Sequence, residues 1–78
     1  MSEEWGNKNV TGRRLRELRE ELGLSQKVVV EMINEMGHSM TPSTISKIEK
    51  GNRSVSDREL MAFSRIYNST IDALFSLV

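Results

Sequence analysis

Residues 41–51 carry the start and stop signals of a short helix, and they read Thr41-Pro42-Ser43-Thr44-Ile45-Ser46-Lys47-Ile48-Glu49-Lys50-Gly51. Thr41 suits the N-cap, because its hydroxyl can accept from the first free backbone N–H groups of the helix. Pro42 then stands at the first helical position, where its missing N–H costs nothing. Met40 and Ile45 have the spacing of a hydrophobic staple across this start. Gly51 suits the left-handed residue that ends a helix, so the pattern predicts about two and a half turns.

The two sides of this helix differ in character. Ile45 and Ile48 share one side, which we expect to face the core. The opposite side follows the i, i+3, i+4, i+7 spacing and carries hydroxyls and cations without a carboxylate, namely Ser43, Ser46, Lys47 and Lys50. Such a side suits a phosphate-lined groove in which base edges present donors and acceptors. It is equally typical of a solvated helix surface, so the neighbouring elements must decide between the two interpretations.

The composition excludes several classes of protein. The chain has 78 residues, with eleven basic and eleven acidic side chains, no cysteine and one histidine, His38. This length supports one small core, and the lack of cysteine excludes disulfides and thiolate metal sites. We interpret His38 as a turn residue and expect no metal, cofactor or small-molecule ligand. No apolar run approaches the ~20 residues that span a bilayer, and no signal-peptide pattern opens the chain. We therefore expect no membrane contact and a cytoplasmic location.

The remaining sequence predicts four more helices, separated by tight turns, and no strand. Their expected ranges are Val10–Leu22, Gln26–Met36, Asp57–Tyr67 and Ile71–Leu77. Their apolar stripes are Leu15, Leu18 and Leu22, then Val29, Ile33 and Met36, then Leu60, Phe63, Ile66 and Tyr67. Either Asn9 or Thr11 can cap the first helix, and Ser56 with Glu59 has the spacing of a capping box.

The first eight residues show no periodicity, and we expect them to form a flexible arm ahead of a domain spanning residues 9–78. Trp5 is the one large apolar residue of this arm. It has two interpretations, packing back onto the core or contacting a partner.

Three runs of sequence are specific in combination: Arg14-Leu15-Arg16-Glu17-Leu18-Arg19-Glu20, Gly23-Leu24-Ser25-Gln26, and the run from Ser43 to Gly51. With the apolar positions from Leu60 to Leu74, they make the chain resemble the phage repressor and Cro-like (XRE-type) helix-turn-helix family, from about Val10 to Phe75. The resemblance implies an all-α, compact five-helix lambda-repressor-like domain whose second and third helices form the helix-turn-helix. It also implies sequence-specific binding of double-stranded DNA by a homodimer that acts as a transcriptional repressor or regulator.

The resemblance further implies roles for particular residues. Those expected to face the bases of the major groove are Thr41, Pro42, Ser43, Ser46 and Lys47. Those expected to contact phosphates are Ser25, Gln26, Lys50, Asn52 and Arg53. Gln26 opens a helix, where free N–H groups and the helix dipole favour an anion. Arg19 and Glu49 are expected to form a structural ion pair between the first and third helices.

The sequence departs from the family pattern between the second and third helices. This segment is about five residues longer than the common pattern, and we interpret Asn34–Met40 as an extra helical turn plus a longer loop. Val30 stands where a small alanine is usual, and Pro42 where relatives often carry Gln or Arg. Base reading then depends mainly on Lys47, since serine hydroxyls discriminate weakly between bases. We therefore expect modest specificity per half-site, supplemented by dimer spacing or DNA shape.

The apolar C-terminus favours self-association or a second class of function. The residues expected to form a dimer or partner surface are Ile71, Phe75, Leu77 and Val78. The competing interpretation is that Ile71, Leu74 and Phe75 close the core. An alternative function is an antitoxin or protein-interaction adaptor that uses this helix. Since the sequence has no His/Cys/Asp arrangement and no Gly-rich phosphate loop, we predict that the protein is not an enzyme.

Overall fold

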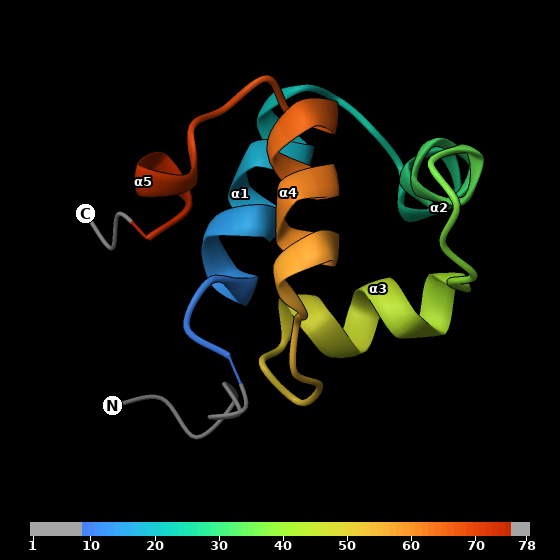
Figure 1. Cartoon of the computed structure of the whole chain (residues 1–78), viewed down its shortest axis with the longest axis horizontal. Helices are drawn as coiled ribbons and strands as arrows, with labels where there is room; N and C mark the ends of the chain where they lie inside the picture. Colours follow the sequence, from blue (N-terminus) through green and yellow to red (C-terminus); the bar gives the residue numbers. More distant parts are fainter. Residues whose placement is uncertain (1–8, 76–78) are drawn as a thin grey trace.

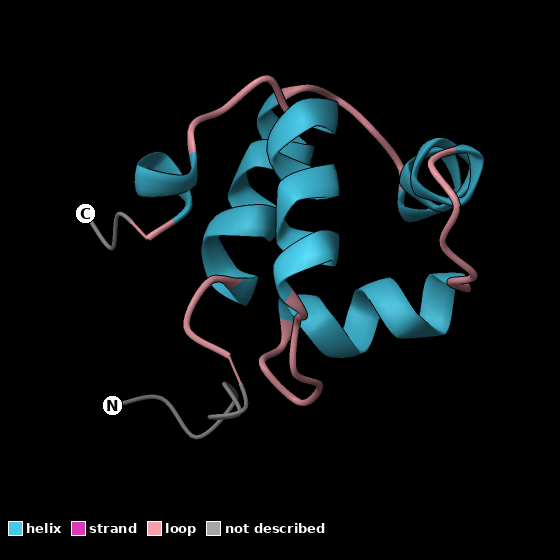
Figure 2. Cartoon of the chain, viewed as in Figure 1, coloured by secondary structure: helices cyan, strands magenta, loops and turns pink. Residues whose placement is uncertain are grey.

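The computed structural model describes residues 9–75, which contain five helices and no strand (Figures 1 and 2). The helices are α1 (Gly12–Glu21), α2 (Gln26–Glu35), α3 (Pro42–Glu49), α4 (Asp57–Ile66) and α5 (Ile71–Leu74). The predicted all-α, five-helix fold is confirmed. No helix within residues 9–75 is long and apolar enough to cross a membrane. The predictions for residues 1–8, including Trp5, and for Leu77 and Val78 concern positions outside the described residues.

Both helices of the helix-turn-helix, α2 and α3, pack against other helices of the domain. α3 packs against α1 and α2, α2 also packs against α4, and α4 packs against α5. In Figure 1, α3 crosses the end of the molecule at which α4 begins. The buried apolar core between these helices consists of Leu15, Val29, Ile33, Met40, Ile45, Ile48, Ala62, Phe63, Tyr67 and Leu74. Removing this apolar surface from water supplies the main favourable term in folding.

Side-chain caps set the first residue of most helices. The hydroxyl before each of four helices accepts from the backbone N–H three residues further on, at Ser25, Thr41, Ser56 and Thr70. At α1, Thr11 occupies the N-cap position without such a bond. Instead, Oδ1 of Asn9 accepts from the backbone N–H groups of Thr11 at 3.0 Å and Gly12 at 2.5 Å. The side chain of Asn9 is therefore the cap, and α1 begins at Gly12 rather than at the predicted Val10.

Two apolar side chains predicted to face the core lie at the surface instead. Leu22 and Met36 are the C-cap residues of α1 and α2, and they are 52% and 39% exposed. Each is followed by a glycine with positive φ, Gly23 at 70° and Gly37 at 99°. The chain turns away there, so the helical period no longer directs these side chains inward.

The last helix is shorter than predicted, because α5 ends at Leu74 rather than at Leu77. Of its side chains and its C-cap, Leu74 is fully buried, whereas Ile71 and Phe75 are 38% and 48% exposed. The interpretation in which Ile71, Leu74 and Phe75 close the core is therefore confirmed for Leu74 and wrong for Ile71 and Phe75. In Figure 1, α5 lies on the opposite side of α1 and α4 from α2, so these two residues are separate from the helix-turn-helix.

Candidate nucleic-acid interface

The outer side of α3 is open to solvent. Pro42, Ser43 and Lys47 are exposed and Ser46 is half-buried, while Ile45 and Ile48 lie buried on the other side. The ammonium of Lys47 forms no ion pair within residues 9–75. One helix therefore presents hydroxyls and a free cation on a surface of the kind that major-groove base edges accept.

The start of α3 is held by a reciprocal pair of threonines. Oγ1 of Thr41 accepts from the backbone N–H of Thr44 at 3.2 Å, and Oγ1 of Thr44 accepts from the backbone N–H of Thr41 at 3.3 Å. This is a capping box in which threonine replaces the usual Glu or Gln. The hydroxyl of Thr41, predicted to face the bases, is thus engaged in the cap. Thr44, to which the sequence analysis assigned no role, orients the exposed first turn of the helix.

The long connection between α2 and α3 is braced by Asn34. Nδ2 of Asn34 donates to the carbonyl of Met40 at 3.0 Å, and Oδ1 accepts from the backbone N–H of Met40 at 2.8 Å. α2 continues to Glu35, and the residues from Met36 to Thr41 form the connection. Since Met40 is itself buried, these two bonds fix the residue that immediately precedes the cap of α3. An asparagine in the last turn before a long connection is the sequence signal for this brace.

Arg19 and Glu49 form a bidentate ion pair that joins α1 to α3. Nε of Arg19 lies 2.6 Å from Oε2 of Glu49, and Nη2 donates to Oε1 at 3.1 Å. The side chains are 12% and 4% exposed, and hydrogen bonding to Glu49 raises the pKa of Arg19. Nη1 of Arg19 also donates to the carbonyl of Leu24 at 2.9 Å. The pair therefore fixes α3 relative to α1 and to the turn that precedes α2.

Gln26 extends this network to the first residue of α2. Its Nε2 donates to Oε1 of Glu49 at 3.2 Å, so the side chain predicted to contact a phosphate is anchored to α3. An amide nitrogen carries two donors, so one N–H is left for an external acceptor. The backbone N–H groups at the start of α2 lie beside it, where the helix dipole favours an anion.

A hollow of about 150 Å³ opens beside Gln26, and it is lined by Arg16, Arg19, Gln26, Ser46, Glu49 and Lys50. Three cations and one carboxylate border it, and this excess of positive charge suits a phosphate. Ser46 and Lys50 bring the outer side of α3 to the same place. Arg16, which also pairs with Glu20 at 3.3 Å, was not assigned to this site from the sequence. The available signal was its spacing, because Arg16 lies three positions before Arg19, on the same face of α1, and Arg19 was expected to pair with Glu49 of α3.

Arg53, predicted to contact a phosphate, already has an anionic partner within the protein. Its Nη1 and Nη2 donate to the two carboxylate oxygens of Glu59 at 3.1 and 3.0 Å. These bonds raise the pKa of Arg53 and hold the pKa of Glu59 below its usual range. Glu59 is also the capping-box residue of α4, so Arg53 ties the loop after α3 to the start of α4. Lys50 and Asn52, from the same predicted set, remain exposed.

Asn9 holds the other side of this loop. Its Nδ2 donates to the carbonyl of Ile48 at 3.0 Å and to the carbonyl of Arg53 at 2.8 Å. The residue that caps α1 therefore also satisfies backbone acceptors at the end of α3 and beyond it. The exposed residues Lys50 and Asn52 lie between these two anchored carbonyls.

The comparisons with known proteins agree with this geometry. A family model described as helix-turn-helix matches residues 15–74, which include all of α2, α3 and α4. The crystal structure of the DNA-binding domain of BldD is similar, with a TM-score of 0.70 and 26% sequence identity over 97% of this chain and 100% of that one. No curated protein sequence matches at a comparable level of significance. The chain belongs to the XRE-type (phage repressor and Cro-like) helix-turn-helix family.

Proposed function

We propose that this protein binds double-stranded DNA in a sequence-specific manner and acts as a cytoplasmic transcription regulator, most simply a homodimeric repressor. The observation that carries the proposal is the continuity between the exposed side of α3 and the basic hollow at the start of α2. One surface thus offers base-reading groups next to a phosphate site, which is the arrangement that a helix-turn-helix needs. Membership of the family and the similarity to the DNA-binding domain of BldD support it.

In the proposed complex, α3 enters the major groove and the start of α2 lies on a phosphate. Ser43, Ser46 and Lys47 face base edges, with Lys47 the group best suited to guanine. Gln26, with the free backbone N–H groups beside it, and Lys50 hold the phosphate backbone on the flank. Arg53 can contact a phosphate only if it shares its guanidinium between the phosphate and Glu59 or breaks its ion pair with Glu59. We therefore assign Arg53 a smaller contribution to DNA affinity than its charge suggests.

Replacement of Lys47 by alanine is expected to weaken binding to the preferred duplex by about 5- to 150-fold, because a lost base contact costs about 1–3 kcal/mol. Replacement of Lys50 is expected to weaken all duplexes alike and to reduce the slope of log affinity against log salt by about one. Fluorescence anisotropy at two salt concentrations measures both effects, with a duplex selected from a random pool. Arg65 lies in the last turn of α4, away from α3, and Arg65→Ala is the control. If neither lysine variant changes affinity or slope, α3 does not face DNA.

The proposed dimer uses the exposed apolar residues of the C-terminal region, Ile71 and Phe75, together with Leu77 and Val78, which lie outside the described residues. Phe75→Glu is expected to convert a dimer into a monomer in sedimentation equilibrium, because a charge in an apolar contact is costly to bury. Val10→Glu is the matched control, since Val10 is also exposed but lies at the other end of the domain sequence. A wild-type protein that stays monomeric at high micromolar concentration would contradict the dimer.

The same residues support a second candidate, an antitoxin or adaptor that binds another protein through the C-terminal region. The exposure of Phe75 favours either use of this surface. The two functions differ in one measurement. A stable protein complex through Phe75, in a chain with no affinity for any selected duplex, would favour the adaptor over the regulator.

A further inference from the structure

A groove runs between α2 and α4 on a face of the domain that the proposed DNA site does not use. Two adjoining hollows, of about 190 and 390 Å³, make up this groove, and Met36 and Arg65 line both of them. Its lining residues are Met32, Glu35, Met36, His38, Arg58, Met61, Ala62, Arg65 and Ile66. None of them belongs to α3 or to the hollow beside Gln26.

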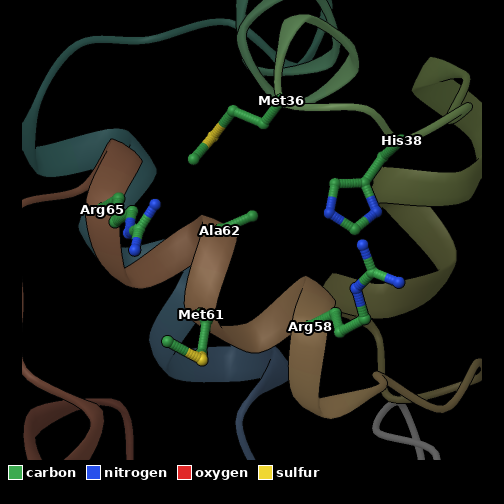
Figure 3. Close-up of a pocket in the computed structure, with 6 residues that line it drawn as sticks. All are labelled: Met36, His38, Arg58, Met61, Ala62 and Arg65. Carbon is green, nitrogen blue, oxygen red and sulfur yellow. The ribbon is translucent and has the colours of Figure 1, made fainter.

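The floor of the groove is rich in exposed methionine. Met36 and Met61 are 39% and 53% exposed, and Met32, Ala62 and Ile66 continue the apolar surface. In Figure 3 the side chains of Met36 and Met61 approach Ala62 from opposite sides. Methionine is flexible and polarizable, so such a surface can adapt to apolar side chains of different shapes. A thioether offers no strong donor to a phosphate, and this floor therefore favours a protein over a nucleic acid.

The border of the groove is basic. Arg58 and Arg65 both come from α4 and are exposed, and His38 lies next to Arg58 (Figure 3). Neither arginine forms an ion pair with a carboxylate of residues 9–75. Glu35 is the one acidic residue among the described side chains that line the groove. An apolar floor between two unpaired guanidinium groups complements a partner that is apolar in the middle and acidic at its edges.

The spacing of these residues points to a helical partner. Arg58 and Arg65 are seven positions apart on α4, or about 10 Å along the helix axis at a 1.5 Å rise. Met61 and Ala62 lie between them at i+3 and i+4, on the same side. A second helix lying along this stripe presents the complementary pattern, with acidic residues at i and i+7 and large apolar residues at i+3 and i+4. The walls are themselves helices, so the groove has the form that helix packing fills.

We propose that the groove between α2 and α4 binds an acidic amphipathic helix of a partner protein. Because the groove shares no lining residue with α3, the partner can bind while α3 lies on DNA. The inference does not depend on the C-terminal surface and goes beyond the proposed DNA binding. It assigns one role, binding of the partner helix, to the exposed methionines of the groove and to the unpaired arginines of α4.

The test uses a synthetic peptide of about 15 residues, a length at which a helix becomes stable enough to form on binding. The peptide carries glutamate at i and i+7 and leucine at i+3 and i+4, and a control peptide carries lysine in place of glutamate. Binding is followed by NMR of the full chain labelled at the methionine methyl groups. Met36 and Met61 report on the groove, and the buried Met40 is an internal control.

The acidic peptide is expected to shift the Met36 and Met61 signals to saturation and to leave Met40 unchanged. The lysine peptide is expected to bind about tenfold more weakly or worse, because two attractive pairs become repulsive. Arg58→Ala combined with Arg65→Ala is expected to weaken the acidic peptide by a smaller factor, because it removes two attractive pairs without adding repulsion, whereas the Arg13→Ala control leaves binding unchanged. Circular dichroism of the variants establishes that each is folded.

Three outcomes would overturn the proposal. Equal affinity for the two peptides would show that the groove binds apolar side chains without selecting acidic partners. Movement of the Met36 and Met61 signals on addition of duplex DNA alone, with displacement of the peptide, would assign the groove to nucleic acid. Movement of those signals on dilution of the protein without peptide would assign it to a second copy of the chain.

Discussion

Replacing Glu49 with alanine is expected to lower the free energy of unfolding by about 3–5 kcal/mol, because the change leaves the partly buried guanidinium of Arg19 without its anion. Glu49 accepts from Nε and Nη2 of Arg19 and from Nε2 of Gln26, and its side chain is 4% exposed. A domain of this size has a total stability of about 4–12 kcal/mol, at 0.05–0.15 kcal/mol per residue. The loss is therefore a large part of the whole.

Urea unfolding followed by circular dichroism measures this effect. Glu20→Ala is the matched control, because Glu20 pairs with Arg16 at the surface with a side chain 55% exposed, and such pairs contribute less than about 1 kcal/mol. Tyr67→Phe is a second comparison, since the buried hydroxyl of Tyr67 has no hydrogen-bond partner and its removal breaks no hydrogen bond. A loss of less than about 1 kcal/mol for Glu49→Ala would mean that the pair is not a structural link.

The ion pair between Arg19 and Glu49 is also expected to affect DNA binding, because it connects the helices of the proposed interface. Arg19, Gln26 and Glu49 belong to α1, α2 and α3, and their contacts fix the start of α2, the proposed phosphate site, relative to α3, the proposed base-reading helix. Glu49→Gln keeps the size of the side chain but removes its charge. We expect it to weaken DNA binding even where the protein is folded, because a protein that binds DNA at two places on one surface needs both in register.

Replacing Gly12 with alanine is expected to destabilise the fold by about 3 kcal/mol or more, although alanine is the better helix former by about 1 kcal/mol. A Cβ on Gly12 would lie 2.1 Å from the carbonyl oxygen of Ile48 and 3.1 Å from that of Glu49. Both are backbone atoms of α3, so neither can move aside as a flexible side chain does. α1 must shift away from α3, which also strains the ion pair between Arg19 and Glu49.

Thermal unfolding of Gly12→Ala beside Gly23→Ala measures this contact. Gly23 has a φ of 70° and no atom within 4 Å of its added Cβ, so its replacement costs only backbone strain of about 1–2 kcal/mol. The comparison separates the cost of a left-handed backbone from that of a close approach between helices. An increase in melting temperature for Gly12→Ala would show that α1 and α3 are farther apart than this structure places them.

The features that could be predicted from the sequence depend on residues close together in the chain. The cap at Thr41, the proline at position 42 and the capping box of Ser56 and Glu59 all occur as predicted, because each involves residues within three positions. The ion pair between Arg19 and Glu49 that the family resemblance implied is also present. The roles assigned to Ser43, Ser46 and Lys47 on DNA stay predictions.

Three of the apolar residues whose burial was predicted incorrectly lie just past the ends of helices. Leu22 and Met36 fit the apolar period of their helices but lie one residue past the last turn, where the chain changes direction. Phe75 likewise follows the last residue of α5. The apolar periodicity of the sequence does not show at which residue a helix ends, because fraying and capping decide that residue. Periodicity therefore predicts inward-facing side chains at positions where the backbone is no longer helical.

By itself, the amino-acid sequence determined the five helices, their order, the hydroxyl caps of α3 and α4 and the polar side of α3, since caps and periodicity act over one or two turns. The tertiary structure decided which charges meet and which apolar groups stay outside. In the folded domain Arg53 forms an ion pair with Glu59, and Arg16 and Lys50 line the same hollow. Met36 and Met61 line an open groove. The tertiary structure also set Gly12 against Ile48, thirty-six positions away. Such contacts depend on how separate helices pack together, and no local pattern in the chain records that packing.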